Sequence, residues 1–245
     1  MKKLFLTLLV LAASAGLAVP LSGCGKAQKV ETLPPGVYYR QAIYDSNHHD
    51  YIGAEKNFKS LIENYPSYKK TELAELKLGD AYYLSGKYIE AEGAYIGFVN
   101  LHPRSSYAPF AMYYAGMSEY GRMENPGRNQ HPLTKAKSLF EQLISNYPSS
   151  KYSLKGFKYI ALIDDKLAEN EFFSGLYYYN ASLFKPASYM FKEVFREYPK
   201  TGEAPKAVYY LILCYEKLGN KKMAARYKAV LLKKYPETGY AKKLR

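Results

Sequence analysis

Hydrophobic positions recur along this chain at helical spacing, and an alanine, an aromatic residue and a proline recur with them. In the stretch AEKNFKSLIENYP, Ala54 and Phe58 lie about one helical turn apart and so share a face. Pro66 then follows, and proline cannot continue a helix. The motif therefore predicts an amphipathic helix that ends near each proline. Its five copies are Ala54, Phe58 and Pro66; Ala91, Tyr95 and Pro103; Ala136, Phe140 and Pro148; Ala187, Phe191 and Pro199; and Ala224, Lys228 and Pro236.

A second helix precedes each copy, and the second copy displays the pair best. Gly79 and Tyr82 lie on its first helix, a turn follows at 85–87, and Ala91 and Tyr95 lie on the second helix. Small residues allow the paired helices to approach closely, and the tyrosines fill the space beside them. Paired helices repeated about every 34 residues are typical of tetratricopeptide repeats. We therefore predict an all-α solenoid of five tetratricopeptide-like helix-turn-helix repeats.

Two repeats depart from the regular spacing. The prolines at 103, 148 and 199 are spaced more widely than those at either end of the array. In the third repeat the extra residues form the stretch 123–132, which is rich in Gly, Pro and Asn and predicts a loop between the helices. In the fourth repeat they extend the first helix, which we predict as one run from about Ser153 to Tyr179.

The N-terminus has the pattern of an export signal. Lys2 and Lys3 precede an apolar run, Leu4 to Val19, which is short for a membrane span, and the tetrapeptide Leu-Ser-Gly-Cys ends at Cys24. This pattern predicts a lipoprotein signal peptide that is cleaved before Cys24, whose thiol then carries acyl chains such as palmitate. An ordinary signal cleaved near Ala18 and a retained anchor are the alternatives.

The predicted domains follow from this pattern. They are a signal peptide at 1–23, the lipidated cysteine with a proline-terminated tether at 24–35, and a five-repeat domain at 36–245. An acylated cysteine would hold the domain on a membrane surface, because each buried methylene contributes about 0.8 kcal/mol. We expect the outer membrane, with the domain facing the periplasm, because Gly25 and not an aspartate follows the cysteine.

Composition narrows the function further. The chain has 245 residues, 48% of them hydrophobic, only two cysteines and a formal net charge of +13, so helix packing and not a disulfide framework holds the fold. Basic residues crowd its C-terminal end, where Glu237 is the one acid from Gly219 onward. An exported protein meets little nucleic acid, so an acidic protein domain or anionic lipid headgroups fit this end better. A solvated helix face is the alternative.

Catalytic and metal sites find little support in the sequence. His48 and His49 are adjacent in an expected extended turn, where their side chains would point apart, and further ligands are missing. The carboxylates on the long helix have a spacing typical of solvation or helix pairing, and Cys214 sits among apolar residues as a small hydrophobe. We expect no enzyme activity, no metal and no cofactor. The carboxylates in question are Asp164, Asp165, Glu169 and Glu171.

Several stretches resemble one family. They are the Leu-Ser-Gly-Cys tetrapeptide, PPGVYYRQA at 34–42, the Arg-Asn-Gln loop at 128–130, YPSSKY at 147–152 and DKLAENEFFSGLYY at 165–178. Together with the five repeats and the length they resemble the BamD family of outer-membrane assembly lipoproteins over essentially the whole chain. The resemblance implies a non-enzymatic component of the machinery that folds and inserts β-barrel proteins. Its implied partners are a BamA-like barrel subunit, unfolded outer-membrane proteins and further lipoproteins of the complex.

The repeat register places candidate binding residues on the first helices. In the first three repeats these positions form an apolar, aromatic groove that would suit the C-terminal strand of an unfolded barrel protein. Packing between repeats is the alternative for each aromatic residue. The groove candidates are Tyr39, Ile43, Leu73, Leu76, Asp80, Tyr83, Phe110, Tyr113, Met117 and Tyr120. The candidates for docking on the barrel subunit are Lys221, Lys222, Arg226, Lys228, Lys233 and Lys234.

A second functional class stays open at this point. A periplasmic repeat lipoprotein could also serve as a scaffold in envelope division or peptidoglycan organisation. The long helix with DKLAENEFFSGLYY favours barrel assembly, because a generic repeat scaffold needs no such extension.

Overall fold

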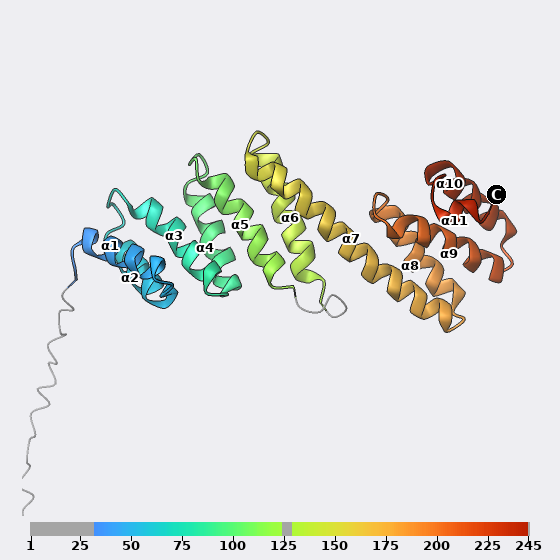
Figure 1. The fold of residues 1–245 in the computed structure, drawn as a ribbon, viewed down its shortest axis with the longest axis horizontal. Helices are drawn as coiled ribbons and strands as arrows, with labels where there is room; N and C mark the ends of the chain where they lie inside the picture. The colour runs from blue at the N-terminus through green and yellow to red at the C-terminus, as the bar shows by residue number, and fades with distance from the viewer. Residues whose placement is uncertain (1–31, 124–128, 245) are drawn as a thin grey trace, which may run out of the picture. The chain divides into compact units, whose positions relative to one another are not determined.

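Paired antiparallel helices make up the part of the chain that the structure, a computed structural model, describes: residues 32–123 and 129–244. Helices adjacent in the chain pack against each other (Figure 1). The pairs are α1 (Pro35–Asn47) with α2 (Tyr51–Asn64), α3 (Thr71–Leu84) with α4 (Tyr88–Leu101), α5 (Ala108–Gly121) with α6 (His131–Asn146), α7 (Lys151–Asn180) with α8 (Phe184–Glu197), and α9 (Glu203–Lys217) with α10 (Lys221–Lys234), followed by α11 (Gly239–Lys242). The predicted all-α fold of five repeats is confirmed.

Only one of the predicted domain boundaries lies within the described residues, the start of the repeat domain. Helix α1 begins at Pro35, one residue before the expected start of the repeat domain, because proline suits the first position of a helix. The predicted signal peptide, Cys24 and the tether up to residue 31 lie outside the described residues. Half of the loop predicted at 123–132, residues 124–128, also lies outside them, and α6 begins at His131, inside the predicted loop.

In three repeats, an aromatic ring of the second helix packs directly on a glycine of the first helix. A Cβ atom added to Gly79 would lie 2.7 Å from the ring of Tyr95, which is 1% exposed. A Cβ atom added to Gly116 would lie equally close to the Phe140 ring, and one added to Gly175 equally close to the Phe191 ring. Contacts this close leave no room for a side chain at these glycine positions of the first helix. The expected role of Gly79 in close helix approach is confirmed, and Tyr95 is the side chain that occupies the space.

The first and fifth repeats fill the same space differently. In the first repeat Ala42 takes the small-residue position, and both Ala42 and Phe58 are buried. In the fifth, Lys228 stands at the aromatic position and is exposed, while Ile212 at the small-residue position is 2% exposed. A larger residue on α9 thus replaces the ring missing from α10. The core of the fifth repeat is thus filled although its copy of the motif lacks the aromatic residue.

Four of the turns within repeats share one backbone geometry. Gly86 and Gly219 adopt positive φ values of 76° and 71°, and His49 and Ser182 adopt 64° and 61° at the corresponding places. The next residue then donates its N–H back to the preceding helix, as Lys87 does to the Tyr82 carbonyl at 2.9 Å. This is a helix-ending motif that glycine adopts without strain.

Each second helix ends two residues before its proline, as the motif predicts. The residue directly before the proline leaves the helical region, for example Tyr65 with φ −138° and ψ 59°, because the proline ring clashes with a helical neighbour. Two of these residues also link successive repeats. The hydroxyl of Tyr147 donates to the Pro103 carbonyl at 3.1 Å, and that of Tyr235 to the Pro199 carbonyl at 2.8 Å.

The ends of α5 and α6 on either side of the long loop are joined by buried charges. Glu119 is fully buried on α5, where Arg122 donates to both of its carboxylate oxygens at 2.9 Å. Lys135 of α6 pairs with Glu119 at 2.9 Å and with Glu92 of α4 at 3.0 Å. A buried carboxylate needs such partners, and removing them would leave an uncompensated charge.

Helix α7 is the longest element and lies at the boundary between two core clusters. It spans Lys151–Asn180, 30 residues, so the predicted helix from Ser153 to Tyr179 is confirmed. The central cluster includes Ile163 and Leu167 of α7, and the C-terminal cluster begins with Ala168. Tyr198, before Pro199, packs against both clusters. One continuous helix therefore connects the third and fourth repeats.

The glycine contact yields a stability prediction. We expect Gly79→Ala to lower the free energy of unfolding by about 1–3 kcal/mol, because the new methyl group would displace the buried Tyr95 ring. Gly93→Ala is the matched control on α4, where a Cβ meets nothing within 4 Å, and it should stabilise by up to about 1 kcal/mol. Urea unfolding measures both. Equal stabilities of the two variants would contradict the packing argument.

Candidate binding surfaces

Five of the ten groove candidates line two hollows on the N-terminal repeats. Tyr39 and Ile43 line the first, of about 380 Å³. Leu73, Leu76 and Phe110 line the second, of about 570 Å³. The other residues lining the hollows are Arg40, Tyr44, Asn47 and Lys70 in the first, and Lys77, Ser106, Tyr107, Lys151 and Tyr152 in the second. The structure thus divides the expected groove into two hollows with apolar walls.

The other five candidates line neither hollow. Tyr113 is 7% exposed and packs against Phe140 and Tyr159, with ring centroids 5.8 Å and 6.0 Å away. The expectation that Tyr113 lies on the groove surface is wrong, because the rings of α6 and α7 cover it. Leu76, which does line the second hollow, is 3% exposed and forms its floor. Tyr83, Met117 and Tyr120 are half-buried against the central core.

Asp80 serves the core and not an apolar groove. Its carboxylate accepts a hydrogen bond of 2.7 Å from the Tyr95 hydroxyl and pairs with Lys77 at 2.7 Å. Burial, with the Asp80 charge beside it, raises the pKa of Tyr95 far above its usual range. The tyrosine hydroxyl therefore stays protonated and donates. Asp80 holds the ring that lies on Gly79.

Lysines surround the two apolar hollows. The ammonium group of Lys70 lies 4.3 Å from the centre of the Tyr39 ring, and that of Lys151 lies 5.3 Å from the Tyr152 ring. Burial raises the pKa of Tyr39, and the charge of Lys77 partly offsets this. Apolar walls with cations at the rim suit a ligand that carries apolar side chains and a negative group.

The six basic docking candidates form an exposed face of α10. All six side chains are exposed, and within the described residues no ion pair joins any of them to an acid. Asn220 caps the helix by accepting from the Met223 N–H at 3.1 Å. Lys233 and Lys234 lie in its last turn, where cations interact favourably with the helix dipole. Lys234 also lies 5.0 Å from the Phe195 ring.

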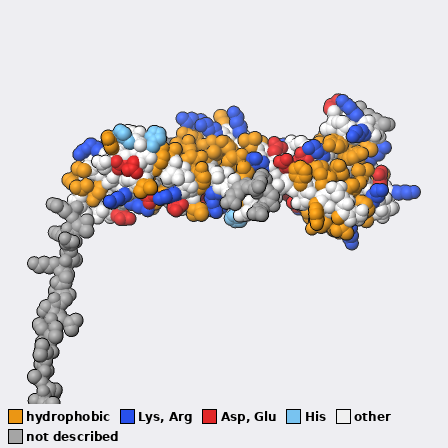
Figure 2. Space-filling view, turned by 60° about the horizontal axis from the view of Figure 1, so that its bottom comes forward, with side chains coloured by type: hydrophobic (Ala, Val, Ile, Leu, Met, Phe, Trp, Pro, Cys, Tyr) orange, Lys and Arg blue, Asp and Glu red, His pale blue; other side chains and the backbone are white. Residues whose placement is uncertain are grey.

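An apolar face between α7 and α8 was missed by the sequence reasoning. Phe173 and Tyr177 of α7 are 57% and 72% exposed. A hollow of about 500 Å³ beside them includes Met190 and Gln130. Hydrophobic side chains are exposed over the central and C-terminal repeats in Figure 2. The signal was present in the sequence, because Phe173 and Tyr177 lie one turn apart, away from the face that carries Phe172.

Histidine and cysteine chemistry finds no assembled site. His49 has a left-handed backbone, so the turn there is not the extended one expected, and the His48 ring is hydrogen-bonded to the Tyr44 carbonyl at 2.8 Å. Burial raises the pKa of the Cys214 thiol to about 12, which keeps it un-ionised. No group of three or more His, Cys, Asp or Glu side chains in the described ranges is arranged to hold a metal ion.

The carboxylates of α7 lie in different surroundings. Asp164 pairs with Lys137 of α6 at 2.7 Å, whereas Glu171 is half-buried with no cation bonded to it. Burial, and the nearby charge of Glu193 on α8, raise the pKa of Glu171. This is a local cost of packing α8 against α7.

The environment of Glu171 yields a pH prediction. A carboxyl whose pKa is raised in the folded state stabilises the fold below its unfolded pKa, and this contribution is lost as the pH rises through the folded pKa. We therefore expect Glu171→Gln to unfold at higher urea than the wild type at neutral pH, with the difference shrinking toward acidic pH. Glu63→Gln, at an exposed position, is the control. A gain for Glu171→Gln that does not depend on pH would contradict this cause.

Known proteins are similar in sequence to this chain over most of its length. The family model YfiO, described as an outer membrane lipoprotein, matches residues 32–231. The outer membrane protein assembly factor BamD of Rickettsia prowazekii is 28% identical over 231 residues, which cover 94% of this chain and 92% of that protein. BamD of Caulobacter vibrioides is 25% identical over 224 residues, covering 89% and 73%.

Solved structures with a related fold are more distant. The tetratricopeptide domain of P58(IPK) aligns with 86% of this chain and 54% of that chain, with 15% identity and a TM-score of 0.45. The MamA protein aligns with 83% and 92%, with 19% identity and a TM-score of 0.38. The assignment rests on the family match. Because that match spans most of the chain, the protein belongs to the BamD family of outer membrane lipoproteins, the family that YfiO describes.

Proposed function

We propose that this protein is a non-enzymatic, lipid-anchored subunit of the machinery that assembles β-barrel proteins in the outer membrane. The observation that carries the proposal is the family match over residues 32–231, with relatives that are named outer membrane protein assembly factors. No helix in the described ranges is both long and apolar enough to cross a membrane. In this proposal Cys24, outside the described residues, carries the acyl chains that hold the protein on the periplasmic side of the membrane.

The N-terminal hollows receive the unfolded barrel protein. Apolar walls at Leu73, Tyr107 and Phe110 suit alternate apolar side chains of an extended strand. Lys77 and Lys151 line the same hollow. Lys77 already pairs with Asp80, so Lys151 is the cation that can pair with a terminal carboxylate. Because the hollow is about 570 Å³, it fits an aromatic side chain and not a whole folded element.

The C-terminal repeats dock on the barrel-forming subunit. The exposed lysines of α10 favour an acidic surface on that partner, and long-range attraction would speed its association. The apolar face of Phe173 and Tyr177 offers a second contact area on the same half of the array. Other lipoproteins of the complex are further partners in this proposal, and nucleic acid is not.

The substrate hollow is tested with charged substitutions at its wall. We expect Leu73→Glu with Tyr107→Glu to weaken binding of a barrel protein's C-terminal peptide about tenfold, because the buried apolar contact is lost. The measurement is fluorescence anisotropy with the labelled peptide, alongside circular dichroism to verify helicity. Leu101→Glu, at a position 68% exposed on α4, is the control. Unchanged binding with intact helicity would exclude the second hollow as the substrate site.

The basic face is tested by charge reversal. We expect Lys233→Glu with Lys234→Glu to reduce severalfold the amount of barrel subunit that co-purifies from envelopes in mild detergent, because opposite charges become like charges. The loss should shrink at high salt, which screens exposed charges. Lys56→Glu with Lys69→Glu makes the same change in net charge at exposed N-terminal positions. Equal losses for both pairs would indicate a net-charge effect and exclude specific docking through α10.

A further inference from the structure

The two halves of α7 have different neighbours. Its C-terminal half is covered, since Gly175 lies against Phe191 of α8 and the Phe172 ring lies 5.6 Å from that of Tyr210 on α9. Its N-terminal half packs against α5 and α6, which leave another side of the helix uncovered. Leu154 and Phe157 are 67% and 56% exposed on that side. Half of the longest helix therefore presents apolar side chains without a covering helix.

This bare face continues the stripe that α9 covers further along. Ala161 follows Leu154 by about two helical turns, and Phe172 follows Ala161 by about three, so all three lie on one side of the helix. Ala161 is exposed and Phe172 is 6% exposed. In the preceding repeat α7 itself covers α5, where Tyr159 contacts both Tyr113 and Tyr120. The uncovered stripe is thus a position at which the array elsewhere places another helix.

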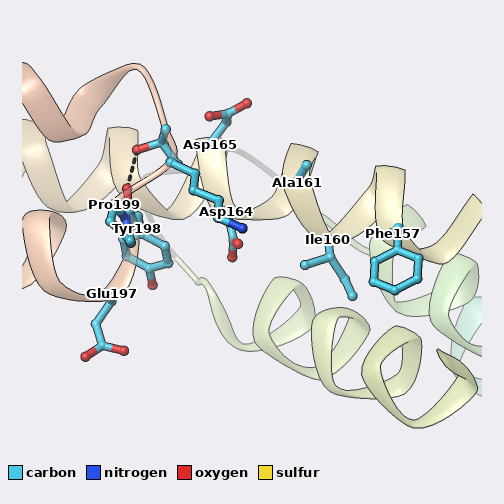
Figure 3. Close-up of a pocket in the computed structure, with 10 residues that line it drawn as sticks. Phe157, Ile160, Ala161, Asp164, Asp165, Glu197, Tyr198 and Pro199 are labelled. Atoms are coloured by element: carbon cyan, nitrogen blue, oxygen red, sulfur yellow. Dashed lines mark hydrogen bonds between the residues drawn. The ribbon is translucent and has the colours of Figure 1, made fainter. Parts of the chain in front are cut away.

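A pocket closes one end of the stripe. It has a volume of about 440 Å³, with Phe157, Ile160 and Ala161 on the α7 side (Figure 3). Its opposite wall is the corner between α8 and α9, from Glu197 to Thr201. That corner is fixed, because the Thr201 hydroxyl donates to the Tyr198 carbonyl at 2.8 Å and Tyr198 packs against two core clusters. The pocket is therefore a formed hollow with a supported wall.

Charge along the stripe is polarised. Asp165, Glu197 and Lys200 line the pocket at one end, and Arg196 already pairs with Glu197 at 2.7 Å. Lys155 and Lys158 are exposed beside Leu154 at the other end. Figure 2 shows acidic side chains where the central and C-terminal repeats meet, on a chain whose formal net charge is +13. Asp164 already pairs with Lys137, whereas no ion pair joins Asp165 to a cation among the residues that the structure describes. An occupant with a cation at the pocket end would complement this pattern.

We propose that the bare face of α7, defined by Leu154, Phe157 and Ala161, is a docking site for an amphipathic α-helix of a partner protein. The partner helix lays an apolar stripe on these residues and places a lysine or arginine over Asp165 in the pocket. The polarised charge sets its direction along α7. This site lies on a different side of α7 from Phe173 and Tyr177, and it does not depend on the proposed role in barrel assembly.

Labelled helical peptides test the proposal on the purified full-length protein. The first peptide has about four turns, leucine at the i, i+3, i+4 and i+7 spacing, and lysines at the end that would face the pocket. In the second, glutamates replace those lysines. We expect the first peptide to bind, and Phe157→Glu to weaken it about tenfold, because the central apolar contact is lost. Ile52→Glu, at a position 71% exposed on α2, should bind it like the wild type.

The charge contact is tested separately. The second peptide should bind the wild type a few-fold more weakly than the first, and Asp165→Lys should reverse that preference. Melting curves of all variants check that the fold is intact. We expect unchanged melting, because Phe157 and Asp165 are exposed.

Several outcomes would overturn the proposal. These are no binding of the first peptide, an equal effect of Phe157→Glu and Ile52→Glu, or no reversal in Asp165→Lys. Sedimentation of the peptide-free protein provides a further check. Self-association that Phe157→Glu abolishes would assign the face to a second copy of this chain and would equally overturn docking of a partner helix.

Discussion

The contact on which the array depends is the ring of a second helix lying on a glycine of the first. Gly79, Gly116 and Gly175 each meet an aromatic ring so closely that no Cβ would fit. The contact brings two helices together and buries a large apolar side chain at the point where they cross. Asp80 then holds the Tyr95 hydroxyl at 2.7 Å, so the ring has a polar as well as an apolar anchor. Repeating this unit yields a core made of contacts between neighbours along the chain.

The departures from this unit generate the surfaces of interest. In the fifth repeat Ile212 fills the core from α9, which releases Lys228 to the exposed basic face of α10. In the fourth repeat, α7 is so long that α8 and α9 cover only half of it. The core remains closed in both cases. A change that packing can absorb inside the array therefore creates a new chemical character outside it.

Much of the fold was predictable because it depends on local rules. Proline ends a helix wherever it occurs, and a residue before proline leaves the helical region, so the ends near Pro66 and Pro103 follow from the sequence alone. The long helix also followed, because its residues show helical periodicity without a break. These features need no knowledge of distant contacts.

Exposure within the groove was less predictable because it depends on side chains from other repeats. Tyr113 and Phe110 lie on the same helix and both are aromatic. Rings of α6 and α7 cover Tyr113, whereas Phe110 keeps one side on the second hollow. Likewise Ile212 compensates for Lys228 only when both helices are in place. A residue's own type and spacing carry no information about such coverage.

The two apolar faces of α7 share one helix but differ in their electrostatic surroundings. Phe157 lines a pocket with charged residues, among them Asp165 and Lys200. Phe173 and Tyr177 line a hollow whose polar residues, Gln130, Asn170 and Ser174, carry no charge. Apolar area alone would not distinguish partners at these faces, because either accepts a hydrophobic stripe. A basic residue on a partner favours the first face and is indifferent to the second. Charge beside the apolar contact, and not the contact itself, then sorts partners between the two sides of α7.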